Sequence, residues 1–337
     1  MMLHRFATNH EPAGFLPGDL VEVRSSAEIL STLDERGALE NLPFMPEMLS
    51  FSGRQFRVSR RAFKTCVDDQ EMRQIENTVF LEDVRCDGKN HGGCAKACLI
   101  FWKEAWLKPV GENLECAGRA ERRRRFGFFG GITRKAPSPL RSAGALQIYA
   151  SDLVALADRD GQFFCQSSEI LNASSPLPFW QPKQYLWDLT HNRVSFFQWV
   201  KSLFIAVYNK VAHMVGFRSW GFVAGPGTQN RTRVSLSLQT GDRVRVKSLA
   251  QIRQTLDADG MHQHLLFAPA MAEFCGREMR VQNRVDKIIL EGTPRQRQIK
   301  DTVLLEGATC DGICHRMCPR QSLLFWRECW LEKVNGS

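Results

Sequence analysis

The chain has 337 residues, of which 43% are hydrophobic and 24% charged, and its formal net charge is +9. This length is long for one compact domain and suits two or three, and the apolar content excludes a chain that needs disulfides in place of a core. The moderate positive charge permits an anionic partner such as nucleic acid, a phosphorylated carrier or a membrane surface, but it does not require one.

The N-terminal residues and the cysteine content both indicate a reducing compartment. Residues 1–15 contain neither an apolar segment nor a small-residue cleavage site, so we expect a cytoplasmic protein without a secretion signal. The chain has 11 cysteines, an odd and high number. In such a compartment, clustered cysteines with an intervening histidine indicate metal binding before disulfides.

Two stretches of the chain resemble each other, residues 18–110 (copy one) and residues 241–334 (copy two). Roughly four aligned positions in ten are identical with almost no gaps, which indicates duplication of a whole domain rather than a solenoid of short repeats. The segments of copy one that return in copy two include Gly18–Val23, Thr32–Asp34, Thr78–Glu82, Cys86–Gly88 and Phe101–Leu107.

Each copy is predicted to contain several short strands and one short helix. In copy one, residues 18–23 alternate apolar and polar side chains after a turn signal, which predicts the first strand. Helical spacing of apolar residues predicts a short helix over 27–33. Further strands are predicted over 55–60, 78–84 and 102–110. The pattern favours a mixed, mainly β fold: two homologous, small SH3-like barrel domains in tandem, with a partly helical insert between them.

Residues 111–240 form this insert, which begins with a predicted linker and contains the clearest helix of the chain, over 195–214. One side of that helix is apolar and carries Phe197, Val200, Phe204, Val207, Val211 and Met214. Too many polar residues interrupt it for a transmembrane span. We expect the apolar side to pack against the two barrels. The alternative is peripheral contact with a membrane surface. It is less favoured because only a few basic residues flank the polar side, whereas membrane-anchoring helices usually carry more.

A Cys/His knuckle recurs in both copies, with the pattern Cys-Asp-Gly-x-x-His-x-x-Cys. In copy one, five residues compete for the four ligand positions that zinc prefers: Cys66, Cys86, His91, Cys94 and Cys98. A four-cysteine set would also suit an iron–sulfur cluster, but the spacing matches neither of the familiar ferredoxin patterns, which favours zinc. Buried free thiols are the remaining alternative. Of the other cysteines, Cys165 could add a ligand from the insert.

The knuckle of copy two offers a different ligand set. Its candidates are Cys310, Cys314, His315 and Cys318. Cys66 aligns with Ile289 and Cys98 with Ser322, so two of the cysteines of copy one are missing here. Adjacent Cys314 and His315 are poorly placed to reach one ion together, so the sequence supports a metal site in copy one more strongly.

Two further features are candidate binding elements. Four tryptophans at matching positions could stack on bases or clamp a peptide, although recurrence in both copies favours a core role: Trp102, Trp106, Trp326 and Trp330. Four consecutive arginines, Arg122, Arg123, Arg124 and Arg125, precede several phenylalanines and resemble an arm that binds phosphate or nucleic acid. A solvated basic loop is the simpler interpretation.

The motifs resemble those of an uncharacterised bacterial protein family. The resemblance is carried by Gly18–Ser25, Met45–Met48, Cys86–Cys94 and Phe101–Leu107, and it extends into the insert at Cys165 and Gln166 and over 180–189. It covers most of the chain. The resemblance implies a bacterial accessory protein of the cytosol, and it implies no particular activity.

The sequence contains no recognisable catalytic motif, because it lacks a phosphate-binding glycine loop, a Gly-x-Ser-x-Gly elbow and a His-Glu-x-x-His helix. We therefore expect a metal-stabilised, non-catalytic binding or adaptor protein, with zinc as the metal and a protein or carrier as the partner. Two alternatives stay open. One is a nucleic-acid-binding protein that uses the barrels and the arginine arm, and the other is an iron–sulfur or metal-dependent redox enzyme.

Overall fold

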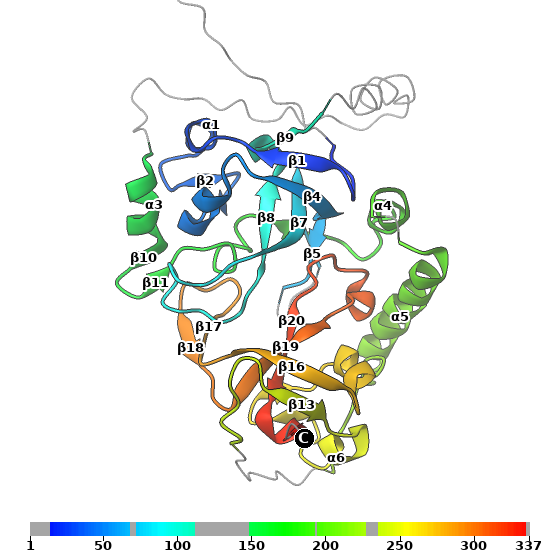
Figure 1. Cartoon of the computed structure of the whole chain (residues 1–337). Helices are drawn as coiled ribbons and strands as arrows, with labels where there is room; N and C mark the ends of the chain where they lie inside the picture. Colours follow the sequence, from blue (N-terminus) through cyan, green and yellow to red (C-terminus); the bar gives the residue numbers. More distant parts are fainter. Residues whose placement is uncertain (1–13, 68–71, 112–147, 193, 227–234, 335–337) are drawn as a thin grey trace, which may run out of the picture.

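The computed structural model describes residues 14–67, 72–111, 148–192, 194–226 and 235–334 (Figure 1). The four arginines Arg122 to Arg125 lie outside these ranges. Within them the protein is mainly β. Two curled five-stranded sheets, each a half-barrel, are built from the two copies. In the view of Figure 1, residues 150–163 of the insert lie on the left and residues 183–191 and 196–214 on the right.

The sheet of copy one has the strand order β8-β7-β4-β1-β9, and every neighbouring pair is antiparallel. Its strands are β1 (Leu20–Val23), β4 (Gln55–Arg61), β7 (Thr78–Arg85), β8 (Leu99–Lys103) and β9 (Leu107–Pro109). Strand β1 alternates half-buried and buried residues, as its sequence pattern predicts. The predicted strand over 102–110 is in fact two strands, since the 3-10 turn η2 (Glu104–Trp106) separates β8 from β9.

The sheet of copy two repeats this order as β20-β19-β16-β13-β21. Its strands are β13 (Arg243–Val246), β16 (Glu278–Arg284), β19 (Thr302–Thr309), β20 (Leu323–Arg327) and β21 (Leu331–Lys333). The register also repeats, since Val79 pairs with Trp102 in copy one and Val303 with Trp326 in copy two. Equivalent sequence positions therefore occupy equivalent positions in the two sheets.

The short helices and hairpins of the two copies also correspond. The predicted helix over 27–33 is observed as α1 (Ser26–Leu30), which begins with a capping box between Ser25 and Glu28. Its counterpart is α6 (Leu249–Arg253). The 3-10 turn η1 (Pro46–Phe51) corresponds to η3 (Pro269–Phe274), and η2 corresponds to η5 (Glu328–Trp330). The two-residue hairpin strands are β2 (Ala38–Leu39) with β3 (Leu42–Pro43), and β14 (Met261–His262) with β15 (Leu265–Leu266).

Each copy has a core of its own, built around its tryptophans. Trp102 and Trp106 lie against Phe44 in one core, and Trp326 and Trp330 lie against Phe267 in the other, all in edge-to-face geometry. All four indoles are fully buried. No indole face is left for a base or a peptide, so the packing supports the core role and not the binding role.

Two glutamates lie between these tryptophans, where the chain turns at η2 and η5. Glu104 and Glu328 are buried, and each forms an ion pair with an arginine at an equivalent position, Arg61 at 2.7 Å and Arg284 at 2.8 Å. Their carboxylates also accept backbone N–H groups from the segment that leads into each copy. These charges are paired inside the protein and do not face solvent.

The insert contributes helices and short strands that touch both copies. It contains α3 (Ala150–Ala157), β10 (Asp158–Arg159), β11 (Gln162–Phe163), β12 (Ser175–Pro176), α4 (Lys183–His191) and α5 (Phe196–Met214). Strand β12 extends a small sheet of copy one with β5 (Lys64–Thr65) and β6 (Arg73–Gln74). The equivalent hairpin of copy two is β17 (Lys287–Ile289) with β18 (Gln296–Gln298).

Helix α5 matches the predicted helix over 195–214, but it packs the opposite way round. The side that packs on copy two carries small and apolar residues with two polar ones: Ile205 contacts Ile313, the Ser202 hydroxyl donates to the Ile313 carbonyl at 3.1 Å, and Asn209 donates to the Cys314 carbonyl at 3.5 Å. The six apolar residues expected to pack on the barrels are all exposed. The predicted packing of this face is therefore wrong. Within the described ranges, no helix combines the length and apolar content that a membrane span requires.

Candidate metal centre

The knuckles of the two copies have the same backbone turn. In copy one, the N–H of His91 donates to the Gly88 carbonyl at 3.0 Å and that of Cys94 donates to the His91 carbonyl at 3.1 Å. In copy two the corresponding distances are 2.9 and 3.0 Å. Gly88 has a φ of +68°, and a Cβ there would meet the Cys94 carbonyl oxygen at 1.9 Å. Only glycine fits this position, because the turn closes over it.

The turn of copy one brings Cys86 and His91 together with a third residue, Glu47 from η1. The ligand atoms of these three residues lie within 4.8 Å of one another. The Cys86 thiol donates to the Glu47 carboxylate at 3.1 Å, and Nδ1 of His91 lies 3.5 Å from the same oxygen. Among the described residues, this is the only group of three such donors at this spacing. It fits zinc, which binds thiolate, imidazole and carboxylate ligands in proteins.

Glu47 was not among the candidate ligands that the knuckle pattern predicted. It belongs to the segment Met45–Met48, about forty residues before the knuckle, and copy two has Ala270 at the equivalent position. The sequence signal that could have identified this ligand is the presence of a carboxylate in copy one where copy two has none. Only the packing of η1 against the knuckle turn shows that it lies beside Cys86.

His91 is the most telling residue of the centre because its side chain is buried and weakly hydrogen-bonded. It is 1% exposed, and neither ring nitrogen forms a hydrogen bond of normal geometry, although Nδ1 lies 3.5 Å from the Glu47 carboxylate. Burial lowers the pKa of the imidazole, although the nearby Glu47 carboxylate and a backbone group of Phe164 oppose this effect. Buried polar groups are normally well hydrogen-bonded, so a buried imidazole with only these weak contacts indicates a place for a further partner such as a metal ion.

Cysteines of copy one and of the insert line a small cavity beside this histidine. The cavity has a volume of about 30 Å³, and its walls include Cys86, His91, Cys94, Cys98 and Cys165. Burial raises the pKa of the Cys86 and Cys98 thiols, and it raises that of Cys165 to about 12. A metal cation would reverse this preference by stabilising the thiolates. Cys165 follows β11 in the insert, so the insert can supply a ligand to this site, which is the possibility that the sequence raised.

Cys66 does not belong to this group, contrary to one of the predicted ligand sets. Its sulfur lies 3.1 Å from that of Cys318, the last cysteine of the copy-two knuckle. The Cys66 N–H also donates to the Cys318 sulfur at 3.2 Å, and at the equivalent place the Ile289 N–H donates to the Cys94 sulfur at 3.4 Å. Each knuckle therefore reaches across to the other copy through its last cysteine.

The proposed ligand set of copy two is not assembled around one point. None of its candidates, Cys310, Cys314, His315 and Cys318, belongs to a group of three close donors in the described part of the chain. Cys318 faces Cys66, and Cys314 lies in the turn against α5. The hydrogen bond between these two sulfurs raises the pKa of the Cys66 thiol, and together with backbone N–H donors it lowers the pKa of Cys318 against the effect of burial.

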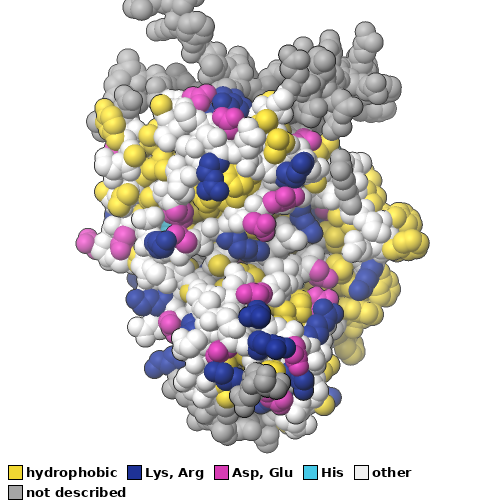
Figure 2. All heavy atoms as spheres, viewed as in Figure 1, with side chains coloured by type: hydrophobic (Ala, Val, Ile, Leu, Met, Phe, Trp, Pro, Cys, Tyr) yellow, Lys and Arg dark blue, Asp and Glu magenta, His cyan; other side chains and the backbone are white. Residues whose placement is uncertain are grey.

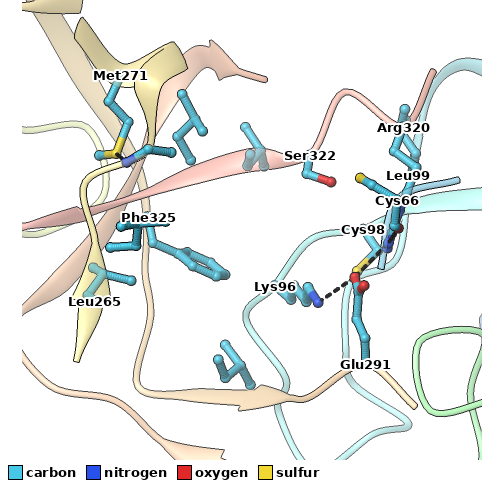
Figure 3. Close-up of a pocket in the computed structure, with 15 residues that line it drawn as sticks. Cys66, Lys96, Cys98, Leu99, Leu265, Met271, Glu291, Arg320, Ser322 and Phe325 are labelled. Carbon is cyan, nitrogen blue, oxygen red and sulfur yellow. Dashed lines mark hydrogen bonds and ion pairs between the residues drawn. The ribbon is translucent and has the colours of Figure 1, made fainter. Parts of the chain in front are cut away.

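A larger cavity, of about 250 Å³, lies between the two copies (Figure 3). On its wall Glu291 binds both Lys96 at 2.8 Å and Arg320 at 2.6 Å, and Arg320 also donates to the Cys66 carbonyl at 3.0 Å. Lys96 and Cys66 come from copy one, and the other two residues come from copy two. This ion-pair network joins the copies close to the metal candidate.

Comparison with known proteins adds no relative, since no protein-family model, curated protein or solved structure matches this chain.

Within the described ranges, no cysteine forms a disulfide.

Proposed function

We propose that this chain is a non-catalytic binding or adaptor protein whose two SH3-like half-barrels are held in place by one structural zinc ion in copy one. The observation that carries this proposal is the buried imidazole of His91, which lacks a hydrogen bond of normal geometry and lies beside Cys86 and Glu47. The cysteines on the adjacent cavity wall supply the remaining ligand.

The small size of the site favours a structural role. Structural zinc sites are closed and use four protein ligands, whereas catalytic sites keep a position open for water or substrate. The cavity beside His91 has a volume of about 30 Å³, which is room for one water molecule or ion and not for a substrate.

The position of the site explains what a metal would stabilise. The Ala95 N–H, one residue after the knuckle, donates to the Lys287 carbonyl of β17 at 2.8 Å. Gln296 of β18 donates to the Gly92 carbonyl at 3.0 Å. A metal that orders the copy-one knuckle would therefore also order the junction with copy two, and Cys165 would tie the insert to it.

An iron–sulfur protein is the second candidate, because four cysteines share one cavity wall: Cys86, Cys94, Cys98 and Cys165. Thiolates bind such clusters as well as zinc. The histidine and the small cavity favour a single ion over a cluster.

Metal analysis and the visible spectrum of the full-length protein, purified without oxygen, test both candidates. About one zinc per chain without colour would support the proposal. Iron with sulfide and a brown absorbance would replace it with the second candidate. The Cys86→Ser variant should lose the metal, whereas Cys329→Ser, a buried cysteine in copy two outside both knuckles, should keep it. A protein that holds neither metal, with all thiols free, would refute a metal centre of either kind.

A further inference from the structure

The exposed side of α5 is an apolar surface that the proposed function does not use. Phe197 is 83% exposed and Met214 is 74% exposed, at opposite ends of the helix. Between them Val200, Phe204, Val207 and Val211 are exposed on the same side. Figure 2 shows this apolar surface on the right of the molecule, over the position of α5 in Figure 1. Large exposed apolar patches mark interaction surfaces in soluble proteins.

The helix is mounted rigidly on copy two by its other side, so the exposed face is a fixed feature of the fold. Ile205 packs against Ile313 and Met317 of the copy-two knuckle, and Ser202 and Asn209 bond to the same turn. The segment after the helix folds back, and Trp220 packs edge-to-face on Phe204 and Tyr208. No rotation of α5 could bury its apolar side without breaking these contacts.

The charges around the face favour an anionic partner. From residue 189 to residue 226 the sequence contains no aspartate or glutamate, but it contains Arg193, Lys201, Lys210 and Arg218. With about 3.6 residues per turn, Lys201 projects beside Phe197 and Phe204 on one edge of the apolar side. Lys210 lies on the other edge, half-buried, with its ammonium 5.9 Å from the centre of the Phe179 ring. Arg218 is less available, since it pairs with Asp259 at 3.0 Å.

We infer that α5 is a membrane-surface helix that binds anionic lipid bilayers, with its phenylalanines and valines in the acyl boundary and its lysines at the headgroups. A single helix with an exposed aromatic and aliphatic side and lysines at its edges can lie in the membrane interface, and the exposure of this side outweighs the small number of basic residues. Lysines extend their alkyl stems along the apolar layer while the ammonium group stays in water. The surface is a projecting helix and not a groove, which suits a bilayer better than a peptide.

A second copy of the chain is the other occupant of suitable chemistry, and the charges disfavour it. Two copies joined through α5 would bring the lysine edges of both helices together without any acidic residue of the 189–226 segment between them. Like charges at an interface oppose association, whereas anionic headgroups attract each lysine by about 1 kcal/mol. The inference does not depend on the metal centre, because none of the candidate ligands of copy one contributes to this face.

Cosedimentation of the full-length protein with vesicles tests the inference. We expect binding to phosphatidylcholine vesicles with about 30% phosphatidylglycerol, weaker binding to pure phosphatidylcholine, and further weakening as salt is added. The double variant Phe197→Ser/Phe204→Ser should lower the partition coefficient at least tenfold. Lys201→Glu should lower it by about fivefold or more, since one lysine contributes about 1 kcal/mol.

The matched control is Leu249→Ser/Leu266→Ser, which removes two exposed leucines of copy two outside the insert. It should bind vesicles like the unchanged protein. Far-ultraviolet circular dichroism verifies that each variant is folded. Absence of binding to anionic vesicles would overturn the inference. A concentration-dependent dimer that the Phe197→Ser/Phe204→Ser variant abolishes, without vesicle binding, would assign the face to a second copy instead.

Discussion

Replacing His91 with leucine separates a metal ligand from a packing residue, because the two roles predict opposite effects on stability. Each unpaired polar atom that is buried costs about 1–3 kcal/mol. Neither ring nitrogen of His91 forms a hydrogen bond of normal geometry. In the metal-free protein, His91→Leu removes a cost of at most about 2–6 kcal/mol and keeps an apolar side chain in the space, so the variant should be at least as stable as the unchanged protein.

Zinc should reverse the order of the two proteins. A ligand that binds only the folded state stabilises it by about 2.7 kcal/mol when its free concentration is a hundred times its dissociation constant. The unchanged protein should gain this increment, and His91→Leu should lose most of it because one of the ligands is gone. The expected result is a crossover: the variant is as stable or more stable with a chelator and less stable with zinc.

Chemical denaturation followed by tryptophan fluorescence measures both states, since the four buried indoles report the unfolding of the two cores. The control is His315→Leu, the equivalent position of copy two, which should keep the zinc increment. If His91→Leu lowers the free energy of unfolding equally with zinc and with chelator, the imidazole has a packing role and the proposed metal centre is wrong.

The remaining predictions concern charge and thiol pairs. Lys64 and Asp188 form a buried ion pair at 2.6 Å that anchors α4, so Lys64→Met should cost about 3–5 kcal/mol in denaturation, and adding Asp188→Leu should recover most of it. Mild oxidation with a small disulfide reagent should link Cys66 to Cys318, because their sulfurs lie only about 1 Å beyond the length of a disulfide bond. Peptide mass mapping without reductant would detect the link. Its absence would contradict the close approach of the two sulfurs. The free energy of unfolding of the metal-free protein should decrease as the pH falls below about 6.5. Burial lowers the pKa of His91 in the folded state, so the unfolded chain binds the proton at a higher pH than the folded protein does. His91→Leu should make stability less dependent on pH in this range.

Several features of the fold could be predicted from the chain because they depend on local patterns. The alternation in β1 and the turn residues around it predicted the first strand, and helical spacing predicted α5 to within a residue or two. The internal similarity predicted that two parts of the chain share an arrangement, and the two sheets have the same strand order and register. The SH3-like identity of these half-barrels and the relation to a bacterial family stay predictions.

The candidate site was only partly predictable, because its members come from distant parts of the chain. Spacing within the knuckle predicted Cys86 and His91, since the Gly88 turn brings them together over a few residues. Glu47 and the separation of Cys66 from the group depend on which elements pack against that turn. The spacing of residues within a knuckle cannot predict which residue of the other copy will lie beside it.

The sequence by itself determined that two stretches of the chain share one pattern, where the first strand and helix α5 lie, and which residue types a metal site would use, because each of these depends on neighbours along the chain. The tertiary structure decided which cysteines meet and which side of α5 faces outward. Periodicity shows that a helix has an apolar side, but its burial depends on the surface that the rest of the protein offers. Here copy two receives the side with Ser202, Ile205 and Asn209, through an apolar contact and the backbone carbonyls of Ile313 and Cys314. The side with the phenylalanines and valines is left exposed.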